Sequence, residues 1–189
     1  MKFKRLATIF SAVLVLSGCG SMHSSGKDLN ISLPLKTKSI APYETDVPVK
    51  IGAAESLFKT NDQGKIEKAL VKSYHQPNDT TSDIALKDNM TNGQTWTAEG
   101  VKSSLEKKKK KSGLVKYSLP ISSITAKGQK LTIKTNSAYP ELVSELANPF
   151  MAIYDTDAKS DVNQTPVGTG PYQIKDYKQS RKISLSNFK

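Results

Sequence analysis

The stretch Pro-Val-Gly-Thr-Gly-Pro-Tyr-Gln-Ile at residues 166–174 carries the clearest structural signal in the chain. Gly168 and Gly170 lack a Cβ, so each can adopt a positive φ or let another backbone approach closely. Pro171 has no N–H to donate and suits the first residue of a strand. The alternation that begins at Tyr172 then points successive side chains to opposite faces. The stretch therefore predicts a tight turn that leads into a strand.

The same stretch lacks the features of a nucleotide-binding loop. A dinucleotide-binding fingerprint would place its third glycine at Gln173, and a Walker loop would continue with Gly-Lys-Ser or Gly-Lys-Thr. From the residues alone we interpret this segment as a glycine-rich turn. We expect two strands to follow it, at 172–177 and 182–187.

Hydrophobic periodicity and turn residues divide the rest of the chain into further elements. Strands are expected at 28–35, 80–86, 121–126 and 130–135. Turns are expected at 60–64, 75–79, 92–93 and 127–129. Helical spacing predicts helices at 51–58, after the capping residue Thr97 with Ala98, Val101 and Leu105 on one face, and from Pro140 to 147 with Leu142, Val143 and Leu146 buried.

Three features near these elements each have two interpretations. Trp96 is expected to anchor the core, with a ligand platform as the alternative. The five lysines at 107–111 suit a helix C-terminus, and we expect them to be solvated or frayed because like charges repel, with phosphate binding as the alternative. His75 is expected to be a solvated turn residue, with a ligand role as the alternative.

The composition limits the possible functions. The chain has 189 residues, of which 37% are hydrophobic and 24% charged, as in a soluble globular protein. Its net charge of +11 suits nucleic acid, anionic lipid or an anionic cell wall. One cysteine excludes an internal disulfide, and two histidines are few for a metal site built by the protein. We find no Gly-x-Ser-x-Gly or His-Glu-x-x-His motif and predict that the chain is not an enzyme, although a site assembled only in the fold stays open.

The N-terminus has the pattern of an export signal. A positively charged segment at 2–5 precedes a mostly apolar run at 6–16, which is too short for an ordinary transmembrane helix. The run ends in Leu-Ser-Gly-Cys at 16–19, which resembles the bacterial lipoprotein box. The alternative is an ordinary signal peptide with a chance cysteine.

The lipoprotein resemblance implies a location and a membrane anchor. Residues 1–18 would be the signal peptide, and Cys19 would carry the lipid at the start of the mature chain. The Gly/Ser-rich residues that follow would make 19–27 a flexible tether. We therefore expect the protein on the extracytoplasmic face of the cell membrane, where nucleic acid is not an expected partner.

Two motifs resemble the peptide/nickel-type extracellular solute-binding proteins of ABC importers, family 5. In that family a Gly-Thr-Gly-Pro-aromatic motif, here residues 168–172, precedes two strands. Residues 92–101 resemble the family's Asp-Gly…Phe-Thr-Ala-Glu-Asp-Val motif, with Trp96 for Phe and Gly100 for Asp. The resemblance implies an α/β fold in which 28–189 form an incomplete first lobe of a two-lobed periplasmic-binding-protein-like fold (type II, peptide-binding class), a mixed sheet with short helices.

The resemblance also suggests ligand-contacting residues. Tyr43 lies in the loop that approaches the ligand cleft in the family, although it could instead be a surface tyrosine packed on a proline. Tyr117 lies near the place of a cleft aromatic. Asn148 stands where some nickel-type relatives carry an arginine that contacts the carboxylate of the chelate. No metal site formed by the protein alone is implied, and no cofactor.

The implied function is capture of nickel, as a small-molecule chelate, or of oligopeptides for transport. The implied partners are the permease and ATPase subunits of the importer, and the binding protein would be a monomer. Because family members are much longer, we expect this chain to be truncated, without the second lobe. The alternative is a small basic surface lipoprotein that acts as a tether or adhesion module.

Overall fold

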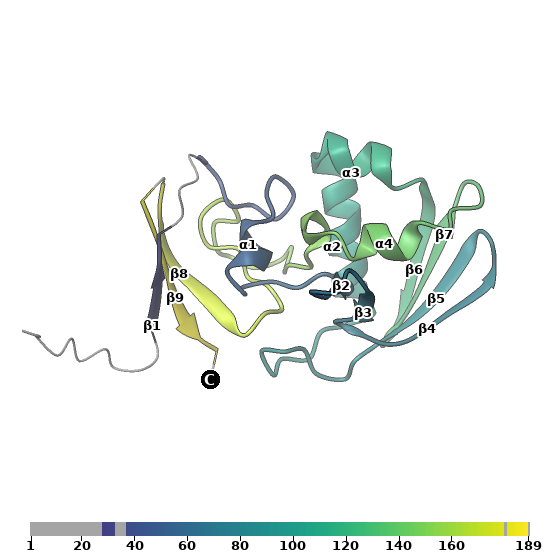
Figure 1. Cartoon of the computed structure of the whole chain (residues 1–189), viewed down its shortest axis with the longest axis horizontal. Coiled ribbons are helices and arrows are strands. Elements are labelled where there is room, and N and C mark those ends of the chain that lie inside the picture. The colour runs from purple at the N-terminus through teal and green to yellow at the C-terminus, as the bar shows by residue number, and fades with distance from the viewer. Residues whose placement is uncertain (1–27, 33–36, 180, 189) are drawn as a thin grey trace, which may run out of the picture.

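The computed structural model describes residues 28–32, 37–179 and 181–188 (Figure 1). The predicted signal peptide, Cys19 and the tether lie outside the described residues. Three antiparallel sheets and four short α-helices make up the described part of the chain, so the predicted combination of strands and short helices is confirmed. The predicted mixed sheet is not found there, because every pairing between described strands is antiparallel.

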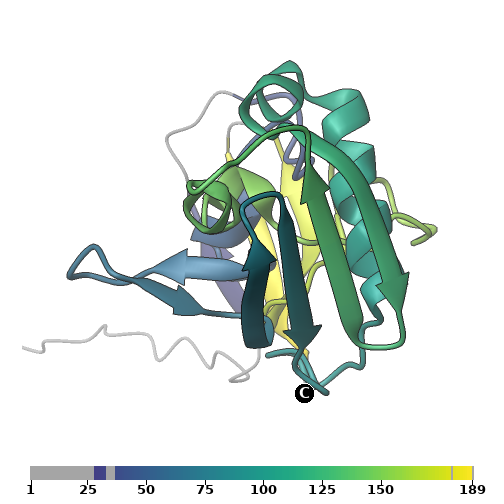
Figure 2. The same ribbon diagram turned by 90° about the vertical axis from the view of Figure 1, so that its right-hand side faces the viewer.

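The largest sheet has four strands in the order β4-β5-β7-β6, and Figure 2 shows it from the side that faces away from the helix α2. Its strands are β4 (Val71–Asn78), β5 (Thr81–Leu86), β6 (Ile121–Lys127) and β7 (Lys130–Thr135). The expected hairpin around Gly128, which has a φ of 60°, and the expected strand near 81–86 are confirmed.

The turn predicted at 75–79 is wrong, because β4 continues to Asn78 and His75 pairs with Asp83 of β5. Pro77 suggested a turn, but β4 is an edge strand, and the register shifts between His75 and Asn78. A proline is tolerated at such an edge or bulge because no neighbouring strand needs its N–H.

The helix α2 (Ala98–Lys111) packs on β6 and β7. It begins as predicted: the Thr97 side chain accepts a hydrogen bond from the Gly100 N–H at 3.2 Å. It also buries the predicted face of Ala98, Val101 and Leu105. The short helices α3 (Gly113–Ser118), α4 (Leu142–Leu146) and η1 (Pro149–Met151) follow it in the chain. Over the described residues, no helix combines the length and the apolar character needed to cross a membrane.

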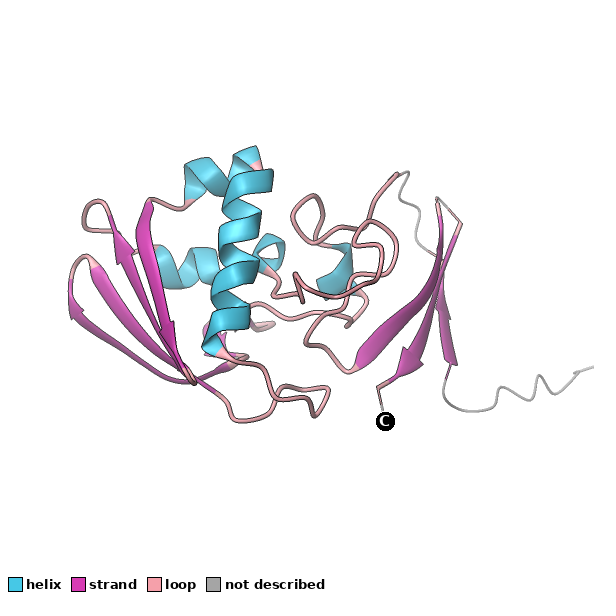
Figure 3. Ribbon diagram, turned by 180° about the vertical axis from the view of Figure 1, so that it is seen from behind, coloured by secondary structure: helices cyan, strands magenta, loops and turns pink. Residues whose placement is uncertain are grey.

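A separate three-stranded sheet, β1-β9-β8, lies at the end of the molecule opposite to the four-stranded sheet (Figure 3). It consists of β1 (Asp28–Ile31), β8 (Tyr172–Lys178) and β9 (Lys182–Asn187), so both strands predicted after the glycine-rich turn are confirmed. Its core contains Ile40, Val47, Ile51, Ala53, Ile174, Tyr177, Ile183 and Leu185. A larger core lies between the four-stranded sheet and helices α2–α4.

The segment that joins the two cores differs from the prediction. The helix expected at 51–58 is wrong: α1 (Val47–Lys50) ends just before it, and Gly52 has a φ of +72°. The apolar residues of this segment are buried, but they lie in a turn and an irregular connection rather than on a helix.

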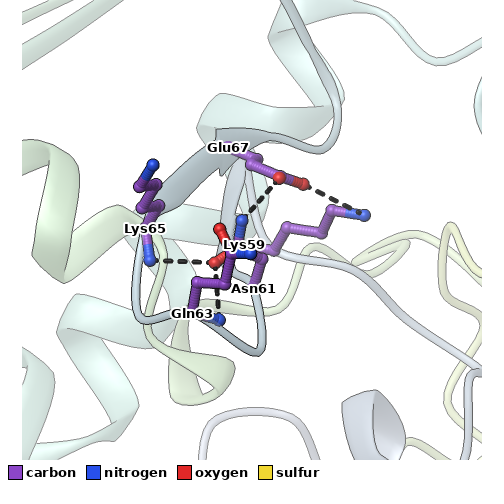
Figure 4. A network of polar contacts seen from close by, with 5 residues as sticks. All are labelled: Lys59, Asn61, Gln63, Lys65 and Glu67. Atoms are coloured by element: carbon purple, nitrogen blue, oxygen red, sulfur yellow. Dashed lines mark hydrogen bonds and ion pairs between the residues drawn. The ribbon is translucent and has the colours of Figure 1, made fainter.

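The hairpin of β2 (Phe58–Thr60) and β3 (Ile66–Lys68) confirms the predicted turn at 60–64. In this turn, shown in Figure 4, Asn61 Oδ1 accepts hydrogen bonds from the backbone N–H groups of Gln63 and Lys65, at 3.0 and 2.9 Å. Asn61 Nδ2 also donates to Glu67 Oε1 at 2.7 Å. The side chain of one asparagine therefore organises the whole turn.

Candidate functional site

The glycine-rich turn lies against the irregular connection between the two cores. A Cβ on Gly168 would be 2.3 Å from the carbonyl oxygen of Ala53, and a Cβ on Gly170 would be 2.2 Å from that of Gly52. Real Cβ atoms do not approach this closely, so both positions require glycine. Neither glycine has a positive φ, and close backbone approach is therefore the reason for them.

Hydrogen bonds hold this close contact in place. Gly170 N–H donates to Ala53 O at 3.1 Å, and the hydroxyl of the fully buried Thr169 accepts from Glu55 N–H at 3.0 Å. The side chain of Asn92, from the predicted Asn-Gly turn, donates to Gly168 O at 3.1 Å. The turn at 168–170 therefore joins segments that are far apart in the sequence, and its role is structural.

Pro171 and Tyr172 continue this contact into the small sheet. Pro171 directly precedes β8, and its carbonyl oxygen accepts from Phe188 N–H at 3.0 Å. The ring of Tyr172 lies over Gly52, where an added Cβ would be 3.0 Å from the ring. Pro171 thus closes the β8–β9 end of the small sheet, while Tyr172, whose N–H also donates to Gly52 O at 3.2 Å, holds that sheet against the connection between the cores.

Lys108 on α2 links the two parts of the molecule. Its side chain is fully buried, so the prediction that all five lysines are solvated or frayed is wrong for this one. Its Nζ donates to the carbonyl oxygen of Pro42 and, at 3.0 Å, to that of Phe150. It also lies 5.3 Å from the centroid of the Tyr154 ring, within reach of a cation–π interaction. The two carbonyls and the ring replace part of the hydration that burial removes.

Burial determines the ionisation of this lysine. It lowers the pKa of Lys108 from 10.5 to about 7, because water no longer stabilises the ammonium. Among the residues that the structure describes, no carboxylate lies within ion-pair distance of its Nζ. Lys108 therefore loses its proton at a much lower pH than an exposed lysine.

Two tyrosines lie beside Lys108. Tyr154 is buried, and its ring centroid lies 6.3 Å from that of the partly exposed Tyr43, with the ring planes tilted by 54°. The Tyr154 hydroxyl is buried without a hydrogen-bond partner among the described residues. Burial, followed by the neighbouring Tyr43, raises the pKa of Tyr154, and burial also raises that of Tyr43. Both tyrosines are therefore neutral at physiological pH.

Asn148 is connected to the same cluster through Lys108. Its side-chain oxygen accepts from Phe150 N–H at 3.0 Å and so begins η1. Its carbonyl oxygen accepts from Ser56 Oγ at 2.9 Å. Because Lys108 bonds to the carbonyls of both Pro42 and Phe150, it fixes the loop of Tyr43 relative to the turn of Asn148.

The third candidate, Tyr117, lies elsewhere on the molecule. It is on α3 with 87% of its surface exposed. Within the described part of the chain, no hydrogen bond or ring contact joins it to Tyr43 or Asn148.

Sequence reasoning missed Lys108, although a signal was present. The apolar stripe at 98, 101 and 105 continues with helical spacing to 108, so this lysine falls on the buried face of α2. Because four more lysines surround Lys108 in the sequence, the whole run is interpreted as exposed, and the helical periodicity that includes position 108 is overlooked.

An open hollow of about 520 Å³ is lined in part by residues that directly follow Tyr154 in the chain. It is lined by residues 94–97, Gly100 and residues 155–157, and Asp155 directly follows the buried Tyr154. Trp96 is 9% exposed and belongs to the larger core, yet it also borders this hollow. Within residues 28–32, 37–179 and 181–188, no group of three His, Cys, Asp or Glu side chains could hold a metal ion.

This arrangement presents groups suited to binding a small molecule. It offers the partly exposed Tyr43, whose loop Lys108 holds near the turn of Asn148, and a pocket beside Trp96 with polar and apolar walls. No nucleophile paired with a base appears among the groups of this cluster. Such a surface can form one wall of a small-molecule site.

The profile described as "Bacterial extracellular solute-binding proteins, family 5 Middle" matches residues 65–189. The chain therefore belongs to family 5 of the bacterial extracellular solute-binding proteins. It is 93% identical to the nickel-binding protein NikA of Staphylococcus aureus, an alignment that covers 100% of this chain and 39% of that protein. The chain thus spans about two fifths of the length of that relative.

Solved structures show the same relationship. The crystal structure of NikA from S. aureus in complex with Ni(L-His)2 matches with a TM-score of 0.82 and 92% identity, over 87% of this chain and 36% of that one. A nickel ABC transporter structure from Bacillus halodurans matches with a TM-score of 0.77 and 31% identity, over 82% of this chain and 33% of that one. The predicted fold class, that of the family 5 binding proteins, is therefore confirmed.

Proposed function

We propose that this chain is part of a substrate-binding protein of an ABC importer and forms one wall of a site for a nickel chelate with a small molecule such as histidine. The likeness to S. aureus NikA bound to Ni(L-His)2, at a TM-score of 0.82 and 92% identity, carries this proposal. Nickel is here the cargo, and the chain needs no cofactor. Oligopeptide cargo, the other substrate class of the family, is the alternative that the experiment below separates.

The chemistry of the chain supports a chelated rather than a bare metal ion. The whole sequence has two histidines and one cysteine, too few for a nickel site built from protein side chains. A chelate brings its own nickel ligands, so the protein needs only to recognise the outer surface of the complex. The ring of Tyr43 and the pocket beside Trp96 are suited to that task.

The remaining expectations follow from this role. We propose a monomer that is tethered through Cys19 to the extracytoplasmic face of the cell membrane and delivers its cargo to permease and ATPase subunits. It binds without catalysing a reaction, and nucleic acid is not among its partners. A basic surface lipoprotein that acts only as a tether or adhesion module would not bind any cargo, which separates the two functions experimentally.

A segment exchange tests the proposal. The matching segment of S. aureus NikA is replaced by this chain, and calorimetry measures binding of nickel with free histidine and of a mixed peptide pool. We expect affinity for nickel–histidine equal to that of the parent and no peptide binding. Loss of nickel–histidine binding by a folded exchange protein would refute the proposal, and tight peptide binding would favour the alternative cargo.

The isolated chain provides the second measurement. Ligand pockets bury most of the surface of a small ligand, and one wall leaves about half of it in water. We therefore expect no submicromolar binding of nickel–histidine by this chain alone. Submicromolar binding would show that one wall is sufficient.

A further inference from the structure

The end of α2 and the helix α3 carry an unusual concentration of positive charge. Residues 107–118 contain six lysines and no acidic residue. Lys108 is buried, and Lys109 is partly buried and donates to the carbonyl oxygen of Ile121. The remaining four lysines of this segment are exposed: Lys107, Lys110, Lys111 and Lys116.

The same segment exposes two large apolar side chains. Leu114 is 59% exposed and Tyr117 is 87% exposed, and both belong to α3. Three residues apart on a helix, they lie on neighbouring positions of one face. Their exposure contrasts with Val115 of the same helix, which is 1% exposed and packs in the larger core. We call Leu114 and Tyr117, together with the four exposed lysines, the α3 patch.

A hollow next to the α3 patch shows that its two helices contribute to one surface. It has a volume of about 460 Å³ and an apolar floor that includes Leu105, Leu119 and Ile124. Lys110 from α2 and Lys116 from α3 both line it. The one acidic residue there, Glu106, lies 3.8 Å from Lys102 in an ion pair. Positive charge therefore dominates the rim of an apolar depression.

We propose that the α3 patch docks on the surface of an anionic lipid bilayer. Lysines near such a surface are attracted by its negative potential, and apolar or amphipathic side chains gain by entering the headgroup region. Tyrosine in particular is suited to this level, because its ring is apolar and its hydroxyl is polar. A soluble polyanion would match the lysines but would offer no apolar phase to Leu114 and Tyr117.

Docking would hold the domain against the membrane. A tether raises the local concentration of the patch, so a weak individual contact is sufficient. The proposal rests on the exposed residues of α2 and α3 and on the proposed tether at Cys19, and it is independent of the transported cargo.

Reconstitution with a reporter beside the patch tests this proposal. The full chain carrying Gly113→Cys is isolated from cell membranes, labelled with an environment-sensitive fluorophore, and placed in vesicles of phosphatidylcholine alone or with phosphatidylglycerol. A Cβ at Gly113 meets no atom within 4 Å, so the substitution leaves the fold intact. The unsubstituted chain, labelled in parallel, measures background at Cys19. We expect a blue shift, and quenching by headgroup-brominated lipid, only in the anionic vesicles.

Matched variants identify the residues responsible. Combining Lys110→Gln, Lys111→Gln and Lys116→Gln should shift the equilibrium away from docking by on the order of a hundredfold, because each lysine near the surface contributes about fivefold. Leu114→Ser with Tyr117→Ser should abolish the shift while leaving the charge unchanged. The control replaces three exposed lysines outside the patch, one in a turn and two at strand ends, and should change nothing: Lys65→Gln, Lys127→Gln and Lys130→Gln.

Four results would overturn the proposal. The first is the absence of a blue shift in anionic vesicles, and the second is an equal blue shift in neutral and anionic vesicles. The third is an equal reduction of the blue shift in the patch variants and in the control variant. The fourth is a shift produced by soluble polyphosphate with neutral vesicles, which would make the patch a polyanion site instead.

Discussion

The buried Lys108 should make the stability of this protein depend on pH. Its pKa falls from 10.5 to about 7 on folding. Between these values the unfolded chain keeps the proton and the folded chain releases it, so stability rises with pH. Below about pH 7 both states are protonated, and the full cost of the buried charge is present. Above 10.5 both states are neutral, and that cost has disappeared.

The magnitude follows from this window. Each pH unit inside it changes the free energy of unfolding by up to about 1.4 kcal/mol for one proton. Between pH 7 and pH 9 the contribution of Lys108 should therefore rise by about 2 kcal/mol. Lys108→Met removes the proton site and roughly keeps the volume, so this part of the pH dependence should vanish. The matched control is Lys107→Met on the adjacent exposed lysine, which should keep the pH dependence of the parent chain.

Urea unfolding followed by circular dichroism at a series of pH values from 6 to 9.5 measures the effect. The informative quantity is the difference in unfolding free energy between parent and variant as pH changes, because the lost hydrogen bonds to Pro42 and Phe150 add a constant offset. A difference that stays flat across the window would refute a buried lysine with a lowered pKa. An equal effect in Lys107→Met would refute its assignment to Lys108.

Three further predictions concern separate parts of the chain. Gly170→Ala should destabilise the fold by about 3 kcal/mol or more in a denaturation assay, since the added Cβ would meet backbone atoms that cannot move aside. Gly113→Ala should be neutral in the same assay, because a Cβ there meets no atom within 4 Å. Equal destabilisation by both substitutions would contradict the close backbone approach at Gly170. Trp96→Ala should cost on the order of 3–5 kcal/mol in a thermal melt, and an unchanged midpoint with lost ligand binding would make Trp96 a platform instead. Cys19→Ala should abolish incorporation of a palmitate analogue in cells, and equal labelling of both proteins would exclude lipidation at Cys19.

Elements that depend on local signals could be predicted from the sequence. The helix after Thr97 has its own cap and apolar stripe, and the hairpin around Gly128 has its own turn residue. The strands after Pro171 follow from the glycine-rich turn and the alternation beyond it. In each case the residues that determine the element lie within it or beside it, so no distant contact is needed.

Elements that depend on distant contacts could not be predicted in this way. The connection after Gly52 has helical apolar spacing, but its irregular, non-helical course is held by hydrogen bonds to residues 168–172, more than a hundred positions away. Likewise, burial of Lys108 requires carbonyl groups from Pro42 and Phe150. The candidate site is therefore harder to predict than the helix that carries it, because its partners come from three separate segments.

This dependence on three segments bears on how the proposed binding wall works. Lys108 bonds to the backbone on both sides of the cluster, so the loop of Tyr43 and the turn of Asn148 are fixed before any ligand arrives. A wall that is already ordered loses little conformational entropy on binding, which favours affinity once a second wall closes over the ligand. The relative NikA is much longer than this chain, which covers 39% of it, so its additional residues are the natural source of that second wall. In the proposed site the buried lysine would act on binding without contacting the ligand, by keeping one face of the site in the geometry that the other face must meet.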